Sequence, residues 1–232
     1  VLIIAPWNYP FQLALCPLIS AVAAGNQVVL KPSELTENTS KIIAEIMAKI
    51  FDKNHVEVIE GDHLVAQNLL LQRWDYIFFT GSVAIGKIVA KAAAEFLTPV
   101  TLELGGKNPC IIEETADLEL AAKRIVWGKF INGGQTCIAP DYLLVHVKVK
   151  ADFIGLLIKE IKAAYGENPQ ESNDLCRIIN LKNWQRLKQL IEGNDIIFGG
   201  KTNEKDLYIA PTIINEPDLE SDVMQDEIFG PI

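Results

Sequence analysis

The sequence has 232 residues, of which 49% are hydrophobic and 22% charged, an ordinary composition for a globular protein. Its formal net charge is -9, from 21 Lys and Arg against 30 Asp and Glu. The sequence contains no cluster of basic residues of the kind that binds nucleic acid. No apolar run reaches the roughly 18–20 residues that a membrane-spanning helix requires. The length allows one large domain or two small ones.

Four widely separated cysteines limit the metal and redox chemistry that the sequence can support. None belongs to a CxxC pair, and no histidine lies nearby at the spacing of a metal ligand. A zinc site and a disulfide framework are therefore not expected, and the pattern favours a reducing compartment such as the cytoplasm. The cysteines are Cys16, Cys110, Cys137 and Cys176.

The ends of the sequence indicate a longer protein. The chain begins at Val1 inside an apolar run and stops on Gly230-Pro231-Ile232. We expect the whole protein to extend beyond both ends, so the sequence gives no information about a leader or a membrane anchor.

The first hundred residues alternate between apolar strand-like runs and helical patterns. The run at residues 1–5 predicts a strand buried on both faces. Pro10 suits the first turn of a helix that continues through Val22, with a kink expected at Pro17. The alternation predicts an α/β fold with a Rossmann-type parallel sheet covered by helices on both faces. The other predicted strands are 27–30, 56–59, 76–79 and 101–104, and the other helices are 37–51, 64–72 and 84–97.

The pattern changes after Gly105-Gly106, which is the best candidate for a domain boundary. We expect one domain at residues 1–104 and a second α/β domain at residues 105–232. The acidic run at 216–227 is typical of a solvated surface. Beyond the glycines the predicted strands are 109–112, 142–149, 196–198 and 208–210, and the predicted helices are 118–130, 151–165 and 182–191.

The stretch from Gly133 to Cys137 has the features of a loop that presents a thiol. Two adjacent glycines allow unusual backbone angles or a close approach to a ligand, and Pro140 ends the local structure. The alternative is a buried structural cysteine beside an ordinary turn, which is the more common situation for a lone cysteine.

Two further polar residues follow strands at the edge where parallel sheets bind ligands. Glu103 is a carboxylate in an apolar strand, which is costly to bury unless it is paired or functional, although it could simply face solvent. Asn8 follows the first strand and offers an amide donor, but asparagine is also common in turns for conformational reasons.

Two other features suit a nucleotide. Lys31 and Glu34 offer a donor and an acceptor for ribose hydroxyls, although charges placed after a strand most often lie on the surface. Residues 81–86, with glycines at both ends, form a strand-to-helix turn whose free amides suit phosphate. The spacing lacks the usual dinucleotide-binding fingerprint and is weak evidence by itself.

Taken together these features occur in the order typical of one family, and the sequence resembles the NAD(P)-dependent aldehyde dehydrogenases along its whole length. The sequence around the motifs is most similar to the fatty-aldehyde, or class 3, branch, at Leu97-Thr98-Pro99-Val100-Thr101 and Cys137-Ile138-Ala139-Pro140-Asp141-Tyr142. The motifs are Trp7-Asn8-Tyr9-Pro10, Lys31-Pro32-Ser33-Glu34, Phe79-Thr80-Gly81-Ser82 with Gly86, Glu103-Leu104-Gly105-Gly106-Lys107, Gly134-Gln135-Thr136-Cys137 and Glu227-Ile228-Phe229-Gly230-Pro231.

The resemblance implies a catalytic role for three residues. Cys137 would be the nucleophile that forms a thiohemiacetal and then a thioester, with Asn8 and the Cys137 N–H holding the oxyanion. Glu103 would be the base that activates water to hydrolyse the thioester. These roles imply an active site in a cleft between a partial cofactor domain and a partial catalytic domain.

The resemblance also implies NAD as the cofactor, with NADP possible, because the Glu34 carboxylate would repel a 2′-phosphate. The expected substrates are medium- or long-chain aliphatic or aromatic aldehydes, and the whole protein is expected to be a cytoplasmic homodimer that could carry a membrane anchor. The residues matched to cofactor contacts are Trp7, Lys31, Glu34, Thr80, Gly81, Ser82, Gly86, Leu104, Glu227 and Phe229.

Three other functions compete with this interpretation. A CoA-acylating relative would pass the thioester to CoA, but Glu103 favours water. A crystallin-like structural protein would have no need of the catalytic residues, which are intact here. A cysteine hydrolase would need a histidine base, and His55, His63 and His146 lie in no recognisable motif.

The resemblance predicts that the isolated 232 residues form no NAD(P)H from hexanal, because segments expected to complete the substrate funnel and the dimer are missing. Absorbance at the NAD(P)H band after mixing purified chain, cofactor and hexanal measures this. Robust turnover would contradict the expectation.

Overall fold

The computed structural model describes residues 1–232, which divide into two compact units, Val1–Gly105 and Gly106–Ile232. The division falls within the glycine pair at which the sequence pattern changes. None of the helices combines the length and the apolar character that crossing a bilayer requires. Each unit has its own core and is described separately.

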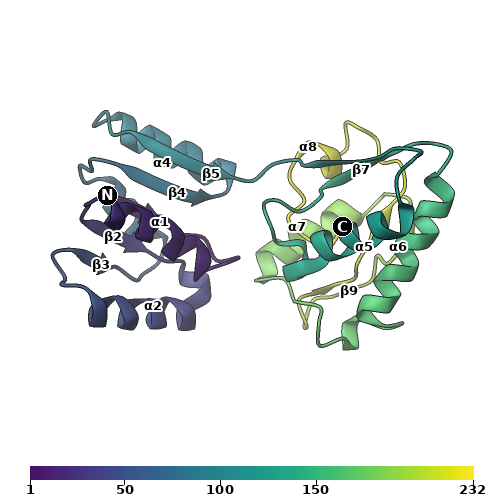
Figure 1. Ribbon diagram of the computed structural model, residues 1–232, viewed down its shortest axis with the longest axis horizontal. Helices are drawn as coiled ribbons and strands as arrows, with labels where there is room; N and C mark the ends of the chain where they lie inside the picture. Colours follow the sequence, from purple (N-terminus) through teal and green to yellow (C-terminus); the bar gives the residue numbers. More distant parts are fainter. The chain divides into compact units, whose positions relative to one another are not determined.

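The first unit is built on a five-stranded parallel sheet with the strand order β3-β2-β1-β4-β5 (Figure 1). The connections are helical, which is the arrangement that parallel strands require. The strands are β1 (Leu2–Ile4), β2 (Val28–Lys31), β3 (Val56–Val58), β4 (Ile77–Gly81) and β5 (Val100–Leu104). The helices are α1 (Gln12–Ala23), α2 (Glu37–Ile50), α3 (His63–Leu70) and α4 (Val83–Ala94), with a 3-10 turn η1 at Glu34–Thr36.

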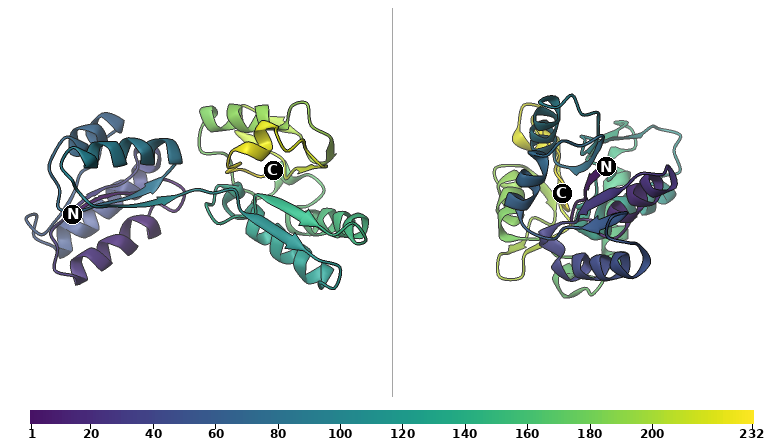
Figure 2. Two further views of the ribbon diagram at one scale, coloured as in Figure 1. Left: turned by 90° about the horizontal axis from the view of Figure 1, so that it is seen from above. Right: turned by 90° about the vertical axis from the view of Figure 1, so that its left-hand side faces the viewer.

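Both faces of this sheet are buried, because alternate residues of each strand point to opposite sides. Helices cover both faces of the sheet (Figure 2). Ile3 packs in one apolar core with residues of α1 and α2, whereas Leu2 and Ile4 pack in another with residues of α3 and α4. These three residues are at most 9% exposed. The predicted α/β class, with a parallel sheet covered on both faces, is confirmed.

The second unit holds three small sheets and four α-helices. Strands β6 and β7 are parallel, whereas β8 pairs with β11 and β9 with β10 in antiparallel fashion. The strands are β6 (Pro109–Ile112), β7 (Tyr142–Val145), β8 (Ile196–Phe198), β9 (Thr202–Asn203), β10 (Tyr208–Ile209) and β11 (Ile213–Ile214). The helical elements are α5 (Leu118–Phe130), η2 (Ile131–Gly134), α6 (Lys150–Tyr165), η3 (Pro169–Glu171), α7 (Leu181–Ile191) and α8 (Asp222–Gln225).

Two of the three apolar clusters in the second unit are large. One joins α5 and α6 to the β6–β7 pair through residues such as Phe130 and Phe153. The other places Trp184 and Leu187 of α7 against the chain near Ile228. The loop that follows α5 and the segment around Ile228 are therefore both attached to packed cores.

Several predicted element boundaries were wrong. Helix α1 begins at Gln12 rather than at Pro10, and it extends to Ala23 with Pro17 inside it. Strand β7 ends at Val145, before the predicted end at residue 149. The acidic run contains the short helix α8, which buries Val223 in a core cluster, and so this run is not merely solvated surface.

Candidate active site

Cys137 lies just beyond the 3-10 turn that follows α5. In this turn Asn132, Gly133 and Gly134 have φ angles of 53°, 62° and 74°, a left-handed conformation that glycine adopts without strain. The turn redirects the chain so that the Cys137 thiol is half-buried rather than enclosed.

Gly134 is required by a close contact with a distant segment. A Cβ atom at this position would lie 2.2 Å from the carbonyl oxygen of Gly230 and 2.4 Å from its carbon. Real side chains do not approach a backbone this closely, so only glycine fits. The cysteine loop therefore lies directly against the segment that carries Glu227 and Phe229.

Side-chain amides hold the backbone on both sides of the thiol. Asn108 donates from Nδ2 to the carbonyls of Cys137 at 2.7 Å and Ala139 at 3.1 Å. Gln135 donates from Nε2 to the carbonyl of Arg177 at 3.2 Å and accepts at Oε1 from the N–H of Ile179 at 3.0 Å. These bonds fix the loop without using the thiol.

Glu227 carries a buried acceptor that lacks a partner. Its Oε1 atom makes no hydrogen bond. Burial raises the pKa of the carboxyl group, and a hydrogen bond from the Gly106 backbone and the charges of Arg186 and Lys129 act in the opposite direction. A buried oxygen without a donor suits a ligand hydroxyl, such as one on a ribose.

The predicted site residues of the first unit lie at the carboxyl ends of parallel strands. Trp7 and Asn8 follow β1, and Lys31 ends β2. In the β4–β5 register Thr80 pairs with Glu103, which is exposed, so its carboxylate is not buried in the strand. The carboxyl ends of parallel strands share one edge, where open α/β sheets bind ligands.

Lys31 is not the surface charge that an isolated lysine suggested. Its side chain is only 3% exposed, and its Nζ donates to the Pro32 carbonyl at 2.8 Å and to Oε2 of Glu34 at 3.0 Å. The Glu34 side chain, at the start of η1, is 40% exposed. The Glu34 carboxylate is therefore accessible to solvent, and the buried Lys31 ammonium holds it in position.

The turn between β4 and α4 combines a helix cap with close packing. Ser82 accepts a hydrogen bond at Oγ from the Ile85 N–H at 3.4 Å, which caps α4. A Cβ atom at Gly86 would lie 2.7 Å from Cδ2 of Leu104, so this glycine lets α4 pack closely on β5. The arrangement leaves the first amides of α4 at the sheet edge, where a helix N-terminus favours anions.

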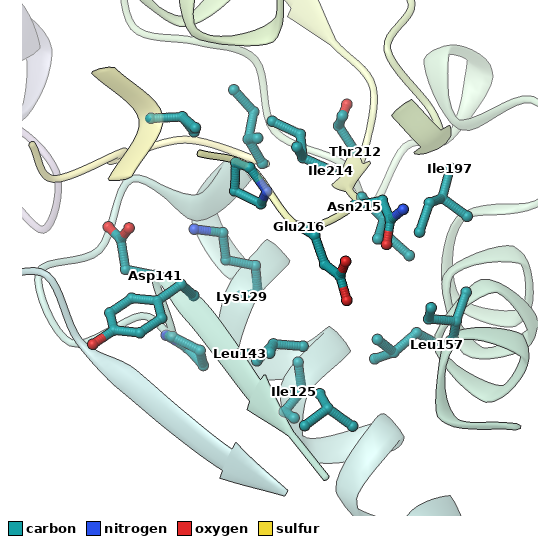
Figure 3. A pocket seen from close by; sticks show the side chains of 18 of the residues that line it. Ile125, Lys129, Asp141, Leu143, Leu157, Ile197, Thr212, Ile214, Asn215 and Glu216 are labelled. Atoms are coloured by element: carbon teal, nitrogen blue, oxygen red, sulfur yellow. The ribbon is translucent and has the colours of Figure 1, made fainter. Parts of the chain in front are cut away.

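The second unit also contains a cavity of about 480 Å³ that Cys137 does not line. Figure 3 shows the side chains that surround it, with Lys129 and Asp141 at one end and apolar residues such as Leu157 farther along. No three His, Cys, Asp or Glu side chains are grouped to hold a metal ion. The thiol site and this cavity are therefore separate features.

The sequence profile of the aldehyde dehydrogenase family matches residues 1–232. The chain belongs to this family. It is 52% identical over 232 residues to aldehyde dehydrogenase family 3 member A2 of Pongo abelii, covering all of this chain and 48% of that protein. It is 48% identical to the dimeric NADP-preferring aldehyde dehydrogenase of Canis lupus familiaris, of which it covers 51%. The chain thus spans about half the length of the curated relatives it matches, and its resemblance to class 3 members is confirmed.

Solved structures of aldehyde dehydrogenases support the fold. The substrate-bound state of Staphylococcus aureus AldH aligns with a TM-score of 0.95 at 51% identity, over 99% of this chain and 51% of that one. The Mycobacterium tuberculosis aldehyde dehydrogenase complexed with NAD+ aligns with a TM-score of 0.90 at 31% identity, over 99% and 50% of the two chains.

Sequence reasoning missed the polar residues that support the aldehyde dehydrogenase motifs. Lys107 stands inside a quoted motif and Asp141 follows the cysteine, but neither was given a role. Gln135 also stands inside a quoted motif without a role, and Asn108 lies just after one. Their partners lie 29 or more residues away for Asn108 and Lys107, so the chain order alone gives no signal of the contacts.

The surroundings of Gly134 and Gly155 predict that alanine has opposite effects on stability at these two positions. Gly134→Ala should lower the free energy of unfolding by at least ~2 kcal/mol, because the new Cβ meets the Gly230 backbone and φ is positive. Gly155→Ala, in the exposed interior of α6 with open space around it, should raise it by about 0.5–1 kcal/mol. Urea unfolding measures both, and a neutral Gly134→Ala would contradict the contact.

Lys129 predicts a pH dependence of stability. Lys129 is 6% exposed, and burial lowers the pKa of its ammonium group from 10.5 to about 8, opposed by Asp141. Between about pH 8 and 10.5 the folded protein has released a proton that the unfolded chain still holds, so this group makes stability rise with pH. Over this pH range the free energy of unfolding should rise by about 3 kcal/mol from this group alone.

The test is the difference in unfolding free energy between the wild type and Lys129→Met at pH 7.5 and pH 10. The wild type should gain stability relative to the variant at the higher pH, and the exposed-site control Lys159→Met should show no such change. Parallel behaviour of the wild type and Lys129→Met would refute the assignment.

Proposed function

We propose that the intact protein is an NAD(P)-dependent aldehyde dehydrogenase that oxidises an aldehyde to a carboxylic acid. The observation that carries the proposal is the contact of the Cys137 loop with the segment of Glu227, whose orphan carboxylate oxygen suits a cofactor hydroxyl. Membership of the family and the names of the relatives support the same activity. Residues 1–104 would form part of the cofactor domain and residues 105–232 part of the catalytic domain.

The first chemical step uses the half-exposed thiol. The Cys137 thiolate attacks the aldehyde carbon, forming a C–S bond while the C=O electrons move to oxygen. The Asn8 amide and the Cys137 N–H would donate to this oxyanion, and such a donor is typically worth ~3–4 kcal/mol in the transition state. The product of the step is a thiohemiacetal on Cys137.

The remaining steps convert this adduct into acid. When bound, NAD(P)+ would supply the oxidising chemistry as a hydride acceptor. Cys137 would hold the acyl group as a thioester, and the Glu103 carboxylate would take a proton from a water molecule that attacks the acyl carbon. The C–S bond breaks, the acid leaves and the thiol is regenerated. The exposure of Glu103 supports this role because water can reach it.

The residues present fit the cofactor. The solvent-facing Glu34 carboxylate, with Lys31 behind it, suits the adenosine ribose. The capped start of α4 after Ser82 suits the pyrophosphate, and Glu227 suits the nicotinamide ribose. The other proposed contacts are Trp7, Thr80, Gly81, Gly86, Leu104 and Phe229.

Glu34 favours NAD, because its carboxylate would repel the 2′-phosphate of NADP. NADP remains a second cofactor to test, because a similar protein is named as NADP-preferring and dimeric. By the same similarity we propose a homodimer. The proposed substrates are medium- or long-chain aliphatic or aromatic aldehydes.

The deciding experiment compares NADH formation by the wild type, Cys137→Ser and Cys176→Ser against a panel of aldehydes. Loss of activity is expected only at Cys137, because Cys176 is a free, exposed cysteine without an assigned role. Retained dehydrogenase activity in Cys137→Ser would overturn the proposal.

In the same assay, Glu103→Gln should keep a first-turnover burst of NADH, and its steady-state rate should then fall by roughly 10²–10⁴-fold.

Added CoA tests the acyl-transfer alternative in the same assay. If water is the acceptor, CoA should leave the steady-state rate of the wild type unchanged and the free acid should be the product. Formation of acyl-CoA would favour the CoA-acylating relative instead.

A further inference from the structure

Asp141 connects the cysteine loop to the segment that carries the proposed cofactor contacts. It lies four residues after Cys137, and its side chain is only 4% exposed. One carboxylate oxygen accepts from Lys107 Nζ, and the other accepts from the backbone N–H of Ile228 at 2.9 Å. A single buried carboxylate thus links three segments that are distant in the sequence.

Lys107 uses all of its donors in the same network. Its Nζ donates to Asp141, to the Val223 carbonyl at 2.6 Å and to the Asp226 carbonyl at 3.0 Å. An ammonium group has three N–H bonds, so none is left for another partner. Removing either charge of this largely buried pair leaves the other without its counter-ion, which is more costly than losing both.

Ile228 is held from both sides of its peptide. Asp141 accepts from its N–H, and Arg186 donates from Nη2 to its carbonyl at 2.6 Å. Glu227 and Phe229 flank this residue, and Phe229 has a φ of 49°, so the local backbone is not in a relaxed extended form. The bonds to the Ile228 backbone therefore also fix the backbone positions from which the Glu227 and Phe229 side chains project.

A second, separate contact holds the thiol. Asn108, beside Lys107, donates to the Cys137 and Ala139 carbonyls, and its own carbonyl accepts from the Asp141 N–H at 2.9 Å. The cysteine backbone is therefore anchored by Asn108, whereas the Asp141 carboxylate is directed at the 226–228 backbone. The two functions can be separated by mutation.

We propose that Asp141, held by Lys107, is a positioning residue for the cofactor: it sets the 226–229 segment against the cysteine loop so that Glu227 can receive the nicotinamide ribose. This inference rests on the proposed function. It assigns Asp141 no contact with substrate and no proton transfer.

The test uses the intact protein with Asp141→Asn, Lys107→Gln and the control Glu216→Gln, whose side chain is 75% exposed in a surface ion pair with Lys150. The quantities measured are kcat, the KM values for NAD and for aldehyde, the rate of Cys137 alkylation by iodoacetamide, and Tm. We expect the KM for NAD to rise about tenfold in Asp141→Asn and Lys107→Gln. The aldehyde KM, the alkylation rate and the control should change less than about twofold.

A merely structural role would lower Tm and the active fraction but leave the KM for NAD unchanged, and that result in either folded variant overturns the inference. If Asp141→Asn does not fold, Lys107→Gln is judged by the same criteria. A wild-type protein without dehydrogenase activity would contradict the proposed function alone. In that case NAD binding, followed by tryptophan fluorescence, replaces KM, and equal dissociation constants for wild type and variants overturn the positioning role.

Discussion

The candidate site depends on the backbone contact between Gly134 and Gly230. No residue with a side chain can occupy position 134, because its first carbon would overlap the Gly230 carbonyl. The contact brings together two segments nearly a hundred residues apart, with no room between them for a side chain at position 134. The left-handed turn before Cys137 and the amide bonds of Asn108 and Gln135 are consistent with this requirement, because they hold the loop in one conformation.

Buried charge is the second constraint on this unit. Lys107, Lys129 and Arg186 face Asp141 and Glu227, so cations outnumber anions in a poorly solvated region. Lys107 and Asp141 satisfy each other, but Glu227 keeps an oxygen without a donor and Lys129 keeps a lowered pKa. Such groups reduce stability, and proteins tend to retain them where a ligand or a reaction uses them.

The two units differ in how far the sequence could predict them. The sheet of the first unit follows from runs such as residues 1–5, because a strand buried on both faces needs apolar side chains at every position. The sequence could not show that Lys31 is buried, because a lysine three residues before its charged partner Glu34 has the same spacing whether the pair is enclosed or solvated. The network around Asp141 was missed for a related reason. Its partners are mostly backbone groups, and any residue can supply a carbonyl or an N–H.

This difference reflects two ways of placing a functional group. In a parallel sheet the register brings Lys31, Thr80 and Glu103 to the carboxyl-terminal parts of their strands. The second unit has no large sheet at its site, and irregular backbone must be held by side chains. Asn108 and Asp141 supply that support, and they can do so only because the unit is folded around them. Family motifs therefore identify the groups that react, whereas the residues that hold them emerge from the packing of the folded unit.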